Sequence, residues 1–408
     1  MPVIKKYAVV LGDSPVRLWG LTSAERLERQ LQQASIEVWH DTLEALPAGS
    51  VVIMLRADYL YDSRVIKGLA KAQQVLLEIE SSSGNVPVAA QVDVAHASAV
   101  GELLTGRGSG IPPAGIALVT VTQVAQGFDA ALLKLDTPFV LPLNEETRGA
   151  QEQLLFSGSY KGITDLVTKW LWPVPAQWAT HLCVGLRITP NQVTALSLVL
   201  AILAGLLFAR GEYAWGLLAG WIMTFLDTVD GKLARVTVTS SRLGNIFDHG
   251  IDLIHPPFWY LAWGIGLASN PTMVTALPLH WLYWAIFVGY IGGRLCEGAF
   301  QLWIASFSMF TWRPVDSYFR LIVARRNPNM IMLTASFALG RPDLGLLAVA
   351  AWTALSTVIL LLRLLMAFPA KGRPEGMRSW LTEIGQTVDE HALAVRVFTR
   401  IKSAENKR

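Results

Sequence analysis

Hydrophobic positions follow two different patterns along this chain. Between residues 7 and 143, short β-rich runs alternate with helical stretches such as 22–33 and 62–72. The β-rich runs are 8–11, 36–39, 51–55, 75–79 and 116–121. This alternation predicts a small α/β domain with a largely parallel sheet.

Apolar runs of membrane-spanning length appear after about residue 191. They cover residues 193–209, 214–226, 251–267, 281–307, 330–339 and 344–368. Two of them, 214–226 and 330–339, fall well short of the roughly 20 residues that a span needs, so neighbouring polar residues must extend them. The pattern predicts an α-helical membrane bundle of about six transmembrane helices.

A tryptophan-rich segment, 160–190, lies between these halves, with Trp170, Trp172 and Trp178 interleaved with lysines. This composition favours an interfacial helix along the membrane, and a plain helical linker is the alternative. The expected organisation is a cytoplasmic α/β domain (1–150), an interfacial juxtamembrane helix (151–190), a six-helix transmembrane domain (191–370) and a cytoplasmic tail (371–408).

Composition agrees with a membrane-embedded chain. Of 408 residues, 52% are hydrophobic and 16% charged, and the mean hydropathy is +0.39. A net charge of only +3 excludes disorder as the dominant state. The two cysteines, Cys183 and Cys296, support neither a disulfide framework nor a cysteine metal site.

Basic residues predict the orientation of the spans. The apolar run just before Gly12 has only about five residues, which is too short for the apolar region of a signal peptide, so we expect the N-terminus not to be exported. Lysines and arginines cluster after the second, fourth and sixth apolar runs. The positive-inside rule therefore predicts a multi-pass protein of the cell membrane with the N-terminal domain and the tail in the cytoplasm. The tail from about residue 378 is expected to be helical and solvated.

Carboxylates concentrate where the second and third runs meet. The segment reads Asp227-Thr228-Val229-Asp230-Gly231-Lys232-Leu233-Ala234-Arg235, followed by Gly244, Asp248 and Asp252. On a helix, the aspartates and small residues of the first stretch fall within an arc of about 100°, and the three later residues within about 80°. Four carboxylates can thus face one another across two helices.

Such a cluster needs cations to offset its repulsion. Oxygen ligands without His or Cys point to a hard ion, Mg²⁺ or Mn²⁺, and two ions are expected. Small residues on the carboxylate face leave space for a nucleotide, and Arg235 offers donors to phosphate oxygens. The alternatives are an ion-paired bundle interior and a carboxylate relay in a transporter.

The spacing Asp227-x2-Asp230-Gly231-x2-Ala234-Arg235-x8-Gly244-x3-Asp248-x3-Asp252 resembles the complete motif of the CDP-alcohol phosphotransferase (CDP-alcohol phosphatidyltransferase) family. The stretch 189–194 resembles the entry to the family's first span, so the resemblance covers roughly residues 161–368. It implies a six-helix transmembrane bundle that forms a homodimer and opens its site to the cytoplasmic side.

The resemblance also implies the reaction. A CDP-alcohol, either CDP-diacylglycerol or a soluble one, would donate its phospho-alcohol group to an acceptor hydroxyl and release CMP, in phospholipid or polar-lipid biosynthesis. Membrane lipids are expected around the bundle, and no nucleic-acid partner is expected. By analogy, Asp227, Asp230 and Asp248 hold the two ions and Asp252 is the base. Gly231, Ala234 and Gly244 would line the cytidine pocket, with Arg235 near the donor phosphate.

Acceptor contacts are less specific. His255 lies on the same helical face as Asp252, and either an acceptor contact or a cap before Pro256-Pro257 explains it. Arg320, Arg325 and Arg326 are candidates for an acceptor phosphate or lipid head group, with positive-inside anchoring as the alternative. Arg294 and Glu297, three residues apart, are expected to pair with each other.

The N-terminal domain carries a looser resemblance. Residues 9–22 resemble the opening of sugar-type nucleotidyltransferases, and 52–58 resemble their strand that ends in a metal-binding aspartate. The glycine-rich loop retains little beyond Gly12, and the expected lysine is absent, which indicates a degenerate cytidylyltransferase-like domain. A bifunctional enzyme for inositol-phosphate-type substrates is the alternative, testable at Asp13, Arg17 and Asp58. An intramembrane prenyltransferase remains a further rival.

Overall fold

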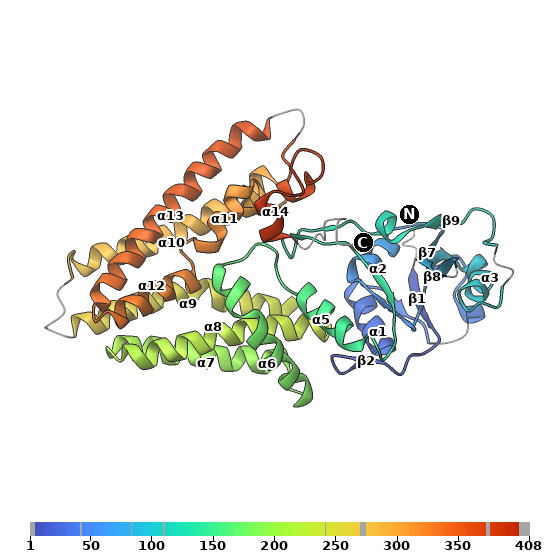
Figure 1. The fold of residues 1–408 in the computed structure, drawn as a ribbon, viewed down its shortest axis with the longest axis horizontal. Helices are drawn as coiled ribbons and strands as arrows, with labels where there is room; N and C mark the ends of the chain where they lie inside the picture. Colours follow the sequence, from blue (N-terminus) through green and yellow to red (C-terminus); the bar gives the residue numbers. More distant parts are fainter. Residues whose placement is uncertain are drawn as a thin grey trace. The chain divides into compact units, whose positions relative to one another are not determined.

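The computed structural model describes residues 5–40, 43–82, 84–108, 111–240, 242–269, 275–372 and 376–399, without the side chains of residues 44, 242, 243, 245–249 and 251. The chain divides into two compact units (Figure 1). The α/β unit comprises residues 1–129, 136–158 and 236–239. The helical unit comprises residues 130–135, 159–235 and 240–408.

A six-stranded sheet forms the centre of the α/β unit, in the order β4-β1-β5-β8-β7-β9. Parallel pairing joins β1 to β4 and β5, and β7 to β9, whereas β8 is antiparallel to both neighbours. The strands are β1 (Lys6–Leu11), β4 (Glu37–Val38), β5 (Val51–Arg56), β7 (Val75–Ser81), β8 (Gly84–Asp93) and β9 (Ala117–Val119). The predicted α/β domain is therefore present.

The sequence pattern missed β8. Its residues include Pro87 and two alanines, which are poor strand formers, so the pattern resembles a loop. The strand forms because both of its edges are paired and because Val88, Ala89 and Ala90 are fully buried.

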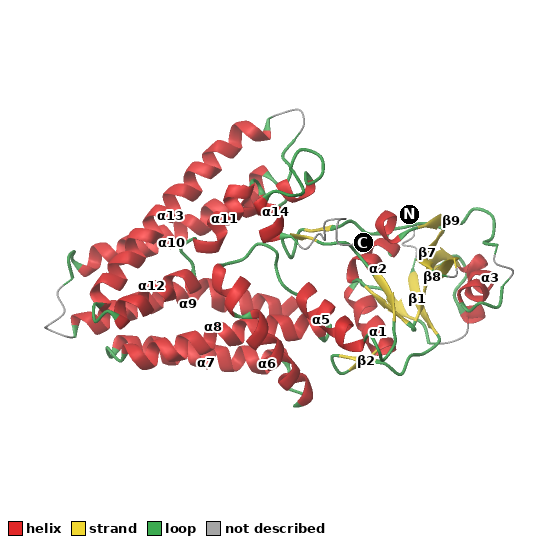
Figure 2. Ribbon diagram, viewed as in Figure 1, coloured by secondary structure: helices red, strands yellow, loops and turns green. Residues whose placement is uncertain are grey.

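Helices cover both faces of this sheet (Figure 2). Alternate residues of β5 face opposite clusters, with Ile53 packing beside α1 residues and Met54 packing beside α3 residues. The helices of this unit include α1 (Ser23–Gln33), α2 (Ser63–Leu69), α3 (Val94–Leu104) and α5 (Arg148–Gly158).

Residues 236–239 join the α/β unit through one face of α1. The Arg26 Nη2 donates to the Val236 carbonyl at 2.7 Å and to the Leu18 carbonyl at 3.1 Å. Arg29 and Gln33 donate to the next two carbonyls at 2.8 and 3.3 Å. Burial lowers the pKa of Arg26 to about 10. The polar atoms of α1 thus satisfy backbone groups.

Every predicted apolar run lies within a helix of the helical unit, apart from the end of the fourth, 300–307, and the last residue of the fifth, Leu339. These helices are α7 (Pro190–Ala209), α8 (Tyr213–Val236), α9 (Arg242–Ala268), α10 (Leu279–Ala299), α12 (Arg326–Ala338) and α13 (Pro342–Lys371). α10 continues as a π-helical turn, Phe300–Ile304, and α11 (Pro314–Ile322) precedes α12.

Length and composition identify two membrane-span candidates within the part of the chain that the structure describes. They are α7 and α13, each with a mean hydropathy of 2.2 over its best window. α12 has only 13 residues, and α8 contains Asp227, Asp230, Lys232 and Arg235, so these helices do not pass the same test. These charged residues make α8 less apolar than an ordinary membrane span.

Aromatic side chains fill the core between α7, α8 and α9. Trp259 and Trp263 are buried, and the Trp263 ring lies 4.2 Å from the Tyr213 ring. Gly266 lets the backbones approach, because a Cβ there would lie 2.2 Å from the Phe208 carbonyl oxygen. These contacts fix the helices that carry the carboxylates.

The segment before α7 exposes apolar side chains. Residues 167–171 form a π-helical turn, and α6 (Pro173–Gly185) follows. The exposed large residues are Trp170, Leu171, Val174, Trp178, Leu182 and Leu186. An interfacial position for this segment stays a prediction.

The prediction of a solvated helical tail is wrong for the part of the tail that the structure describes. Residues 380–382 form a 3₁₀ turn, α14 (Leu393–Phe398) is short, and Trp380 is fully buried. The Trp380 Nε1 donates to Ser317 Oγ of α11 at 2.9 Å. Apolar residues at 380, 381 and 398 pack into the helical unit instead of continuing a surface helix.

Candidate active site

α8 and α9 carry the predicted carboxylates. Asp227 and Asp230 lie one turn apart on α8, and Asp252 lies on α9. Asp248 also belongs to α9, but its side chain lies outside the described residues. The arrangement of two facing helices is as the spacing predicts.

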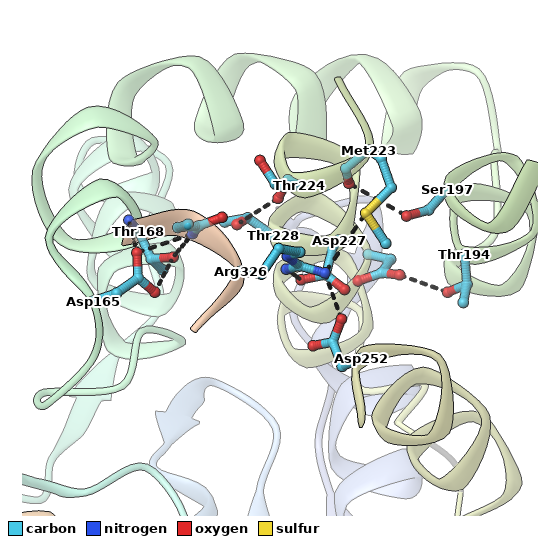
Figure 3. Close-up of polar contacts among 12 residues, drawn as sticks. Asp165, Thr168, Thr194, Ser197, Met223, Thr224, Asp227, Thr228, Asp252 and Arg326 are labelled. Atoms are coloured by element: carbon cyan, nitrogen blue, oxygen red, sulfur yellow. Dashed lines mark hydrogen bonds and ion pairs between the residues drawn. The ribbon is translucent and has the colours of Figure 1, made fainter. Parts of the chain in front are cut away.

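Arg326, the first residue of α12, joins the two helices (Figure 3). Its Nη2 lies 2.5 Å from Asp227 Oδ2, and its Nη1 lies 2.5 Å from Asp252 Oδ1. The side chains of Arg326 and Asp227 are 13% and 15% exposed, whereas Asp252 is 40% exposed. One guanidinium therefore bridges a buried carboxylate and a more accessible one.

Asp230 is the most buried of these aspartates, at 3% exposure. Its Oδ2 accepts a hydrogen bond of 2.6 Å from Thr194 Oγ1 on α7. Ser197, one turn further along α7, donates to the Met223 carbonyl of α8 at 3.3 Å. These bonds fix the rotation of α8 against α7.

The N-terminal turn of α12 supplies two further interior contacts. Asn327 Nδ2 donates to Asp165 Oδ1 at 2.9 Å and to Thr168 Oγ1 at 3.2 Å. Asn329 Nδ2 donates to Tyr260 OH of α9 at 3.0 Å. Both asparagines are buried, so this turn is packed inside the helical unit.

Asp165 is a buried carboxylate that the sequence reasoning missed. Burial raises its pKa, but the charge of Arg320 and hydrogen bonds from Thr168 and Asn327 outweigh this and hold the pKa below its usual value. Its position inside the tryptophan-rich segment 160–190, ahead of the run 193–209, was the available signal.

Arg235 folds back onto its own helix. Its Nη1 donates to the Gly231 carbonyl at 3.0 Å and to the Ser159 carbonyl at 3.3 Å. A Cβ at position 231 would lie 3.3 Å from that nitrogen, so glycine gives the guanidinium room. Ala234 is half-buried on α8 and Gly244 half-buried on α9, so both lie on the helices the motif predicts.

A second group of charges lies around Glu297 of α10. Arg294 Nη1 lies 3.6 Å from Glu297 Oε2, which confirms the predicted pair. Arg325 also forms an ion pair with Glu297 and stacks on Phe310. Glu297 thus balances two arginines.

Cations gather around Lys161. Burial and the charges of Arg235, Arg320 and Arg325 lower the pKa of Lys161 to about 8. Within the described part of the chain, Arg320 Nη1 is buried and has no hydrogen-bond partner. Three of these four residues were predicted as phosphate contacts, and Lys161 was missed in that role because it lies outside the motif.

His255 lies one turn after Asp252 on α9. Its ring packs against Trp259, with the ring centroids 4.7 Å apart. This contact positions the imidazole. A role of His255 in binding the acceptor stays a prediction.

The aspartates fit a hard divalent cation by their chemistry, since Asp227 and Asp230 of α8 and Asp252 of α9 offer carboxylate oxygens. Among the described side chains, no group of three or more His, Cys, Asp or Glu residues is gathered as a metal site. Positive charge between Asp227 and Asp252 comes instead from Arg326.

The α/β unit pairs its candidate residues with near neighbours. Asp58 accepts from Arg56 Nε at 3.0 Å and from Arg56 Nη2 at 2.6 Å. Arg17 Nη1 donates to the Gly20 carbonyl at 3.2 Å, and Asp13 Oδ1 accepts from the Ser14 amide at 2.7 Å. These contacts suffice for a structural role.

Comparison with known proteins places the carboxylate helices inside a family match. Residues 187–382 match the model of the CDP-alcohol phosphatidyltransferase family. Cholinephosphotransferase 1 of Xenopus laevis is 29% identical over 161 residues, covering 36% of this chain and 37% of the relative. Choline/ethanolaminephosphotransferase 1 of Arabidopsis thaliana is 33% identical over 116 residues, covering 24% and 30%.

A bacterial relative is named as a bifunctional enzyme and not as a cholinephosphotransferase. The bifunctional IPC transferase and DIPP synthase of Rubrobacter xylanophilus is 28% identical over 164 residues, covering 40% of this chain and 34% of the relative. The matches therefore span less than two fifths of each of these three relatives.

Proposed function

The chain belongs, through residues 187–382, to the CDP-alcohol phosphatidyltransferase family, and from this premise we propose that it is a membrane phosphotransferase of phospholipid or polar-lipid synthesis. It moves the phospho-alcohol group of a CDP-alcohol to an acceptor hydroxyl and releases CMP. One P–O bond of the pyrophosphate breaks, and one P–O bond to the acceptor forms.

The observation that carries the proposal is the meeting of Asp227 and Asp252 on facing helices within the matched segment. The spacing alone predicted this pairing. A chain that only needed structural ion pairs would not require this pattern of aspartates beside small residues.

Asp227, Asp230 and Asp248 are the proposed ligands of two Mg²⁺ or Mn²⁺ ions. When bound, the ions would neutralise charge on the transferred phosphoryl group. Asp227 and Asp230 share one side of α8, and Thr194 fixes Asp230 in place.

Asp252 is the proposed base for the acceptor hydroxyl. Its side chain is 40% exposed, against 15% for Asp227, so an acceptor reaches it more readily. It takes the hydroxyl proton as the new P–O bond forms, and Arg326 orients its carboxylate.

Donor recognition falls to the small residues of the motif. We assign Gly231, Ala234 and Gly244 to the cytidine pocket and Arg235 to the donor phosphate. Arg235 already donates to the Gly231 carbonyl, so a nucleotide in this pocket would lie beside its guanidinium.

Acceptor recognition is assigned to the cations around Lys161, with His255 beside Asp252. Arg320 carries a buried Nη1 without a hydrogen-bond partner in the described structure, and a phosphate oxygen would satisfy it. Arg325 is largely balanced by Glu297, and Arg326 by two aspartates. This supports an anionic acceptor or lipid head group at Arg320.

The membrane arrangement is part of the proposal. α7 and α13 have the length and composition of spans, and α8, α9, α10 and α12 complete a six-helix bundle. The lysines and arginines place the N-terminal domain and tail in the cytoplasm, and a homodimer is the expected assembly.

A bifunctional enzyme is the second candidate function. The observation in its favour is the bifunctional activity for which the Rubrobacter relative is named, together with an α/β unit preceding the matched segment. Such an enzyme would consume CTP, and Asp13, Arg17 and Asp58 would be required.

The test is cation-dependent CMP release by the purified protein in lipid nanodiscs. CDP-diacylglycerol and soluble CDP-alcohols are offered against plain and phosphate-bearing acceptors. Release that requires one donor, one acceptor and Asp227 supports the proposal. Pyrophosphate release instead of CMP would indicate a prenyltransferase, CTP consumption a bifunctional enzyme, and solute flux without CMP a transporter.

A further inference from the structure

Arg326 occupies the space between two carboxylates that the proposed function assigns to different tasks. Its two terminal nitrogens bond to Asp227 and Asp252, and its Nη1 also lies 3.6 Å from Met223 Sδ. Its Nε is buried without a hydrogen-bond partner in the described structure. The position of the guanidinium therefore depends on these two carboxylates.

Arg326 is the cation that bonds to both carboxylates in the described structure. Lys232 also acts electrostatically on Asp227, and Arg294 and Lys161 act on Asp252. A buried charge without compensation is costly, so the pair of aspartates needs a cation in every state of the protein. A divalent ion bound by the Asp227 carboxylate would compete with Arg326 for the same negative charge, since Arg326 bonds to Asp227 Oδ2.

We propose that Arg326 pairs with Asp227 and Asp252 when no divalent cation is bound, and that it competes with divalent cations for Asp227. Cation binding at the α8 carboxylates would displace its guanidinium from Asp227 and leave its contact with Asp252. This inference rests on the proposed function, because it requires a cation site on α8.

The backbone around Arg326 allows such a side-chain movement. α12 is fixed by Asn327, which bonds to Asp165, and by Asn329, which bonds to Tyr260. Arg326 is the first residue of the helix, after Arg325 with an extended backbone (φ −129°, ψ 174°). Its side chain is therefore free to exchange partners while α12 stays anchored.

The direct test is Mn²⁺ binding to the purified full chain in nanodiscs, without nucleotide, measured from the electron paramagnetic resonance of free Mn²⁺. We expect Arg326→Gln to bind Mn²⁺ about 10-fold tighter than the unsubstituted protein, because the competitor is removed. In EDTA, its melting temperature should fall by roughly 5–10 °C, because the buried Asp227 and the partly exposed Asp252 lose their shared partner. Saturating Mn²⁺ should restore most of this loss.

The matched control is Arg363→Gln. Arg363 of α13 donates to both oxygens of Asp316 on α11, at 2.6 and 2.7 Å, so it is also a forked arginine pair. Neither partner lies on α8 or α9. Its loss should lower the melting temperature equally with and without Mn²⁺ and leave the Mn²⁺ affinity unchanged.

Weaker or unchanged Mn²⁺ binding by Arg326→Gln would overturn the inference, since Arg326 would then orient the carboxylates without competing. If that variant does not fold, Arg326→Lys provides the same test, because one ammonium cannot span both carboxylates. We expect about 3-fold tighter binding for it. No Mn²⁺ binding by the unsubstituted protein would contradict the proposed cation site itself and the inference with it, whereas CMP release is measured separately.

Discussion

Two buried arginines show how the two units of this protein use charge. Arg26 of the α/β unit donates to the carbonyls of Leu18 and Val236. Arg326 of the helical unit bridges Asp227 and Asp252. Each is nearly inaccessible to solvent, yet one satisfies backbone and the other satisfies acidic side chains.

The difference separates stability from chemistry. Carbonyl groups need donors in any folded protein, so Arg26 has a complete structural explanation. Buried aspartates on facing helices are costly unless something else is gained from them. The comparison assigns the chemistry to the helical unit and a supporting role to the α/β unit.

The sharpest challenge to this comparison is substitution of the aspartates themselves. Asp252→Asn should lower turnover by about 10²–10⁴-fold and retain CDP-alcohol binding, because it removes a base. Asp227→Asn should weaken both, because it removes a cation ligand. CMP release and donor binding in nanodiscs are the measurements, and equal loss of donor binding in both variants would contradict the division of roles.

A smaller effect is expected from Arg26→Met. Two carbonyls lose their donor, so the free energy of unfolding should fall by about 1–3 kcal/mol. Turnover per folded molecule and Mn²⁺ affinity should stay unchanged, unlike for Arg326→Gln. Chemical denaturation with parallel CMP-release assays checks this. A loss of turnover in excess of the loss of folded protein would show that the α/β unit takes part in the chemistry.

The pH dependence of stability that Lys161 causes is a further test of this comparison. Its folded-state pKa of about 8 lies below the ordinary value of 10.5, so its charge is a cost to the fold below pH 8. Stability should rise between about pH 8 and 10.5, where the folded state loses the proton first.

Lys161→Met should therefore stabilise the protein by about 1 kcal/mol at pH 7 and reduce that rise. Thermal unfolding followed by tryptophan fluorescence across this pH range is the measurement. Lys67→Met, at an exposed position of α2, is the control and should leave the curve unchanged. Identical curves for the protein and Lys161→Met would disprove the buried cation cluster.

The smallest effect is expected at Asp58. Its ion pair with Arg56 is partly exposed, so Asp58→Asn should cost at most about 1 kcal/mol. CMP release should not change, and CTP should not be consumed by either protein. CTP consumption that disappears in Asp58→Asn would instead support the bifunctional enzyme.

The sequence patterns predicted the helices and strands of this fold better than the contacts between them. The runs that became α7 and α13 were recognisable by hydrophobic length alone. β8 was missed, since Pro87 and its alanines give no strand signal until neighbouring strands pair with it. The prediction for the tail was wrong because Trp380 packs among residues of the helical unit that lie far away in the sequence.

The candidate site shows the same division. Regular helical geometry brings Asp227 and Asp230 to one side of α8, so their spacing is readable from the chain. Nothing in the spacing indicates that Arg326, about 100 positions beyond Asp227, bonds to it. The basic run around 320–326 resembled a membrane-flanking loop until its neighbours were known.

By itself, the sequence determined the helices, the carboxylate face and the resemblance to the family, because helical period and motif spacing are local properties of the chain. Only the tertiary structure decided that Arg326 pairs with Asp227 and Asp252, that Asn327 reaches Asp165 and that Lys161 lies among arginines. Those contacts join distant segments, and their energies depend on burial and on which charges face one another.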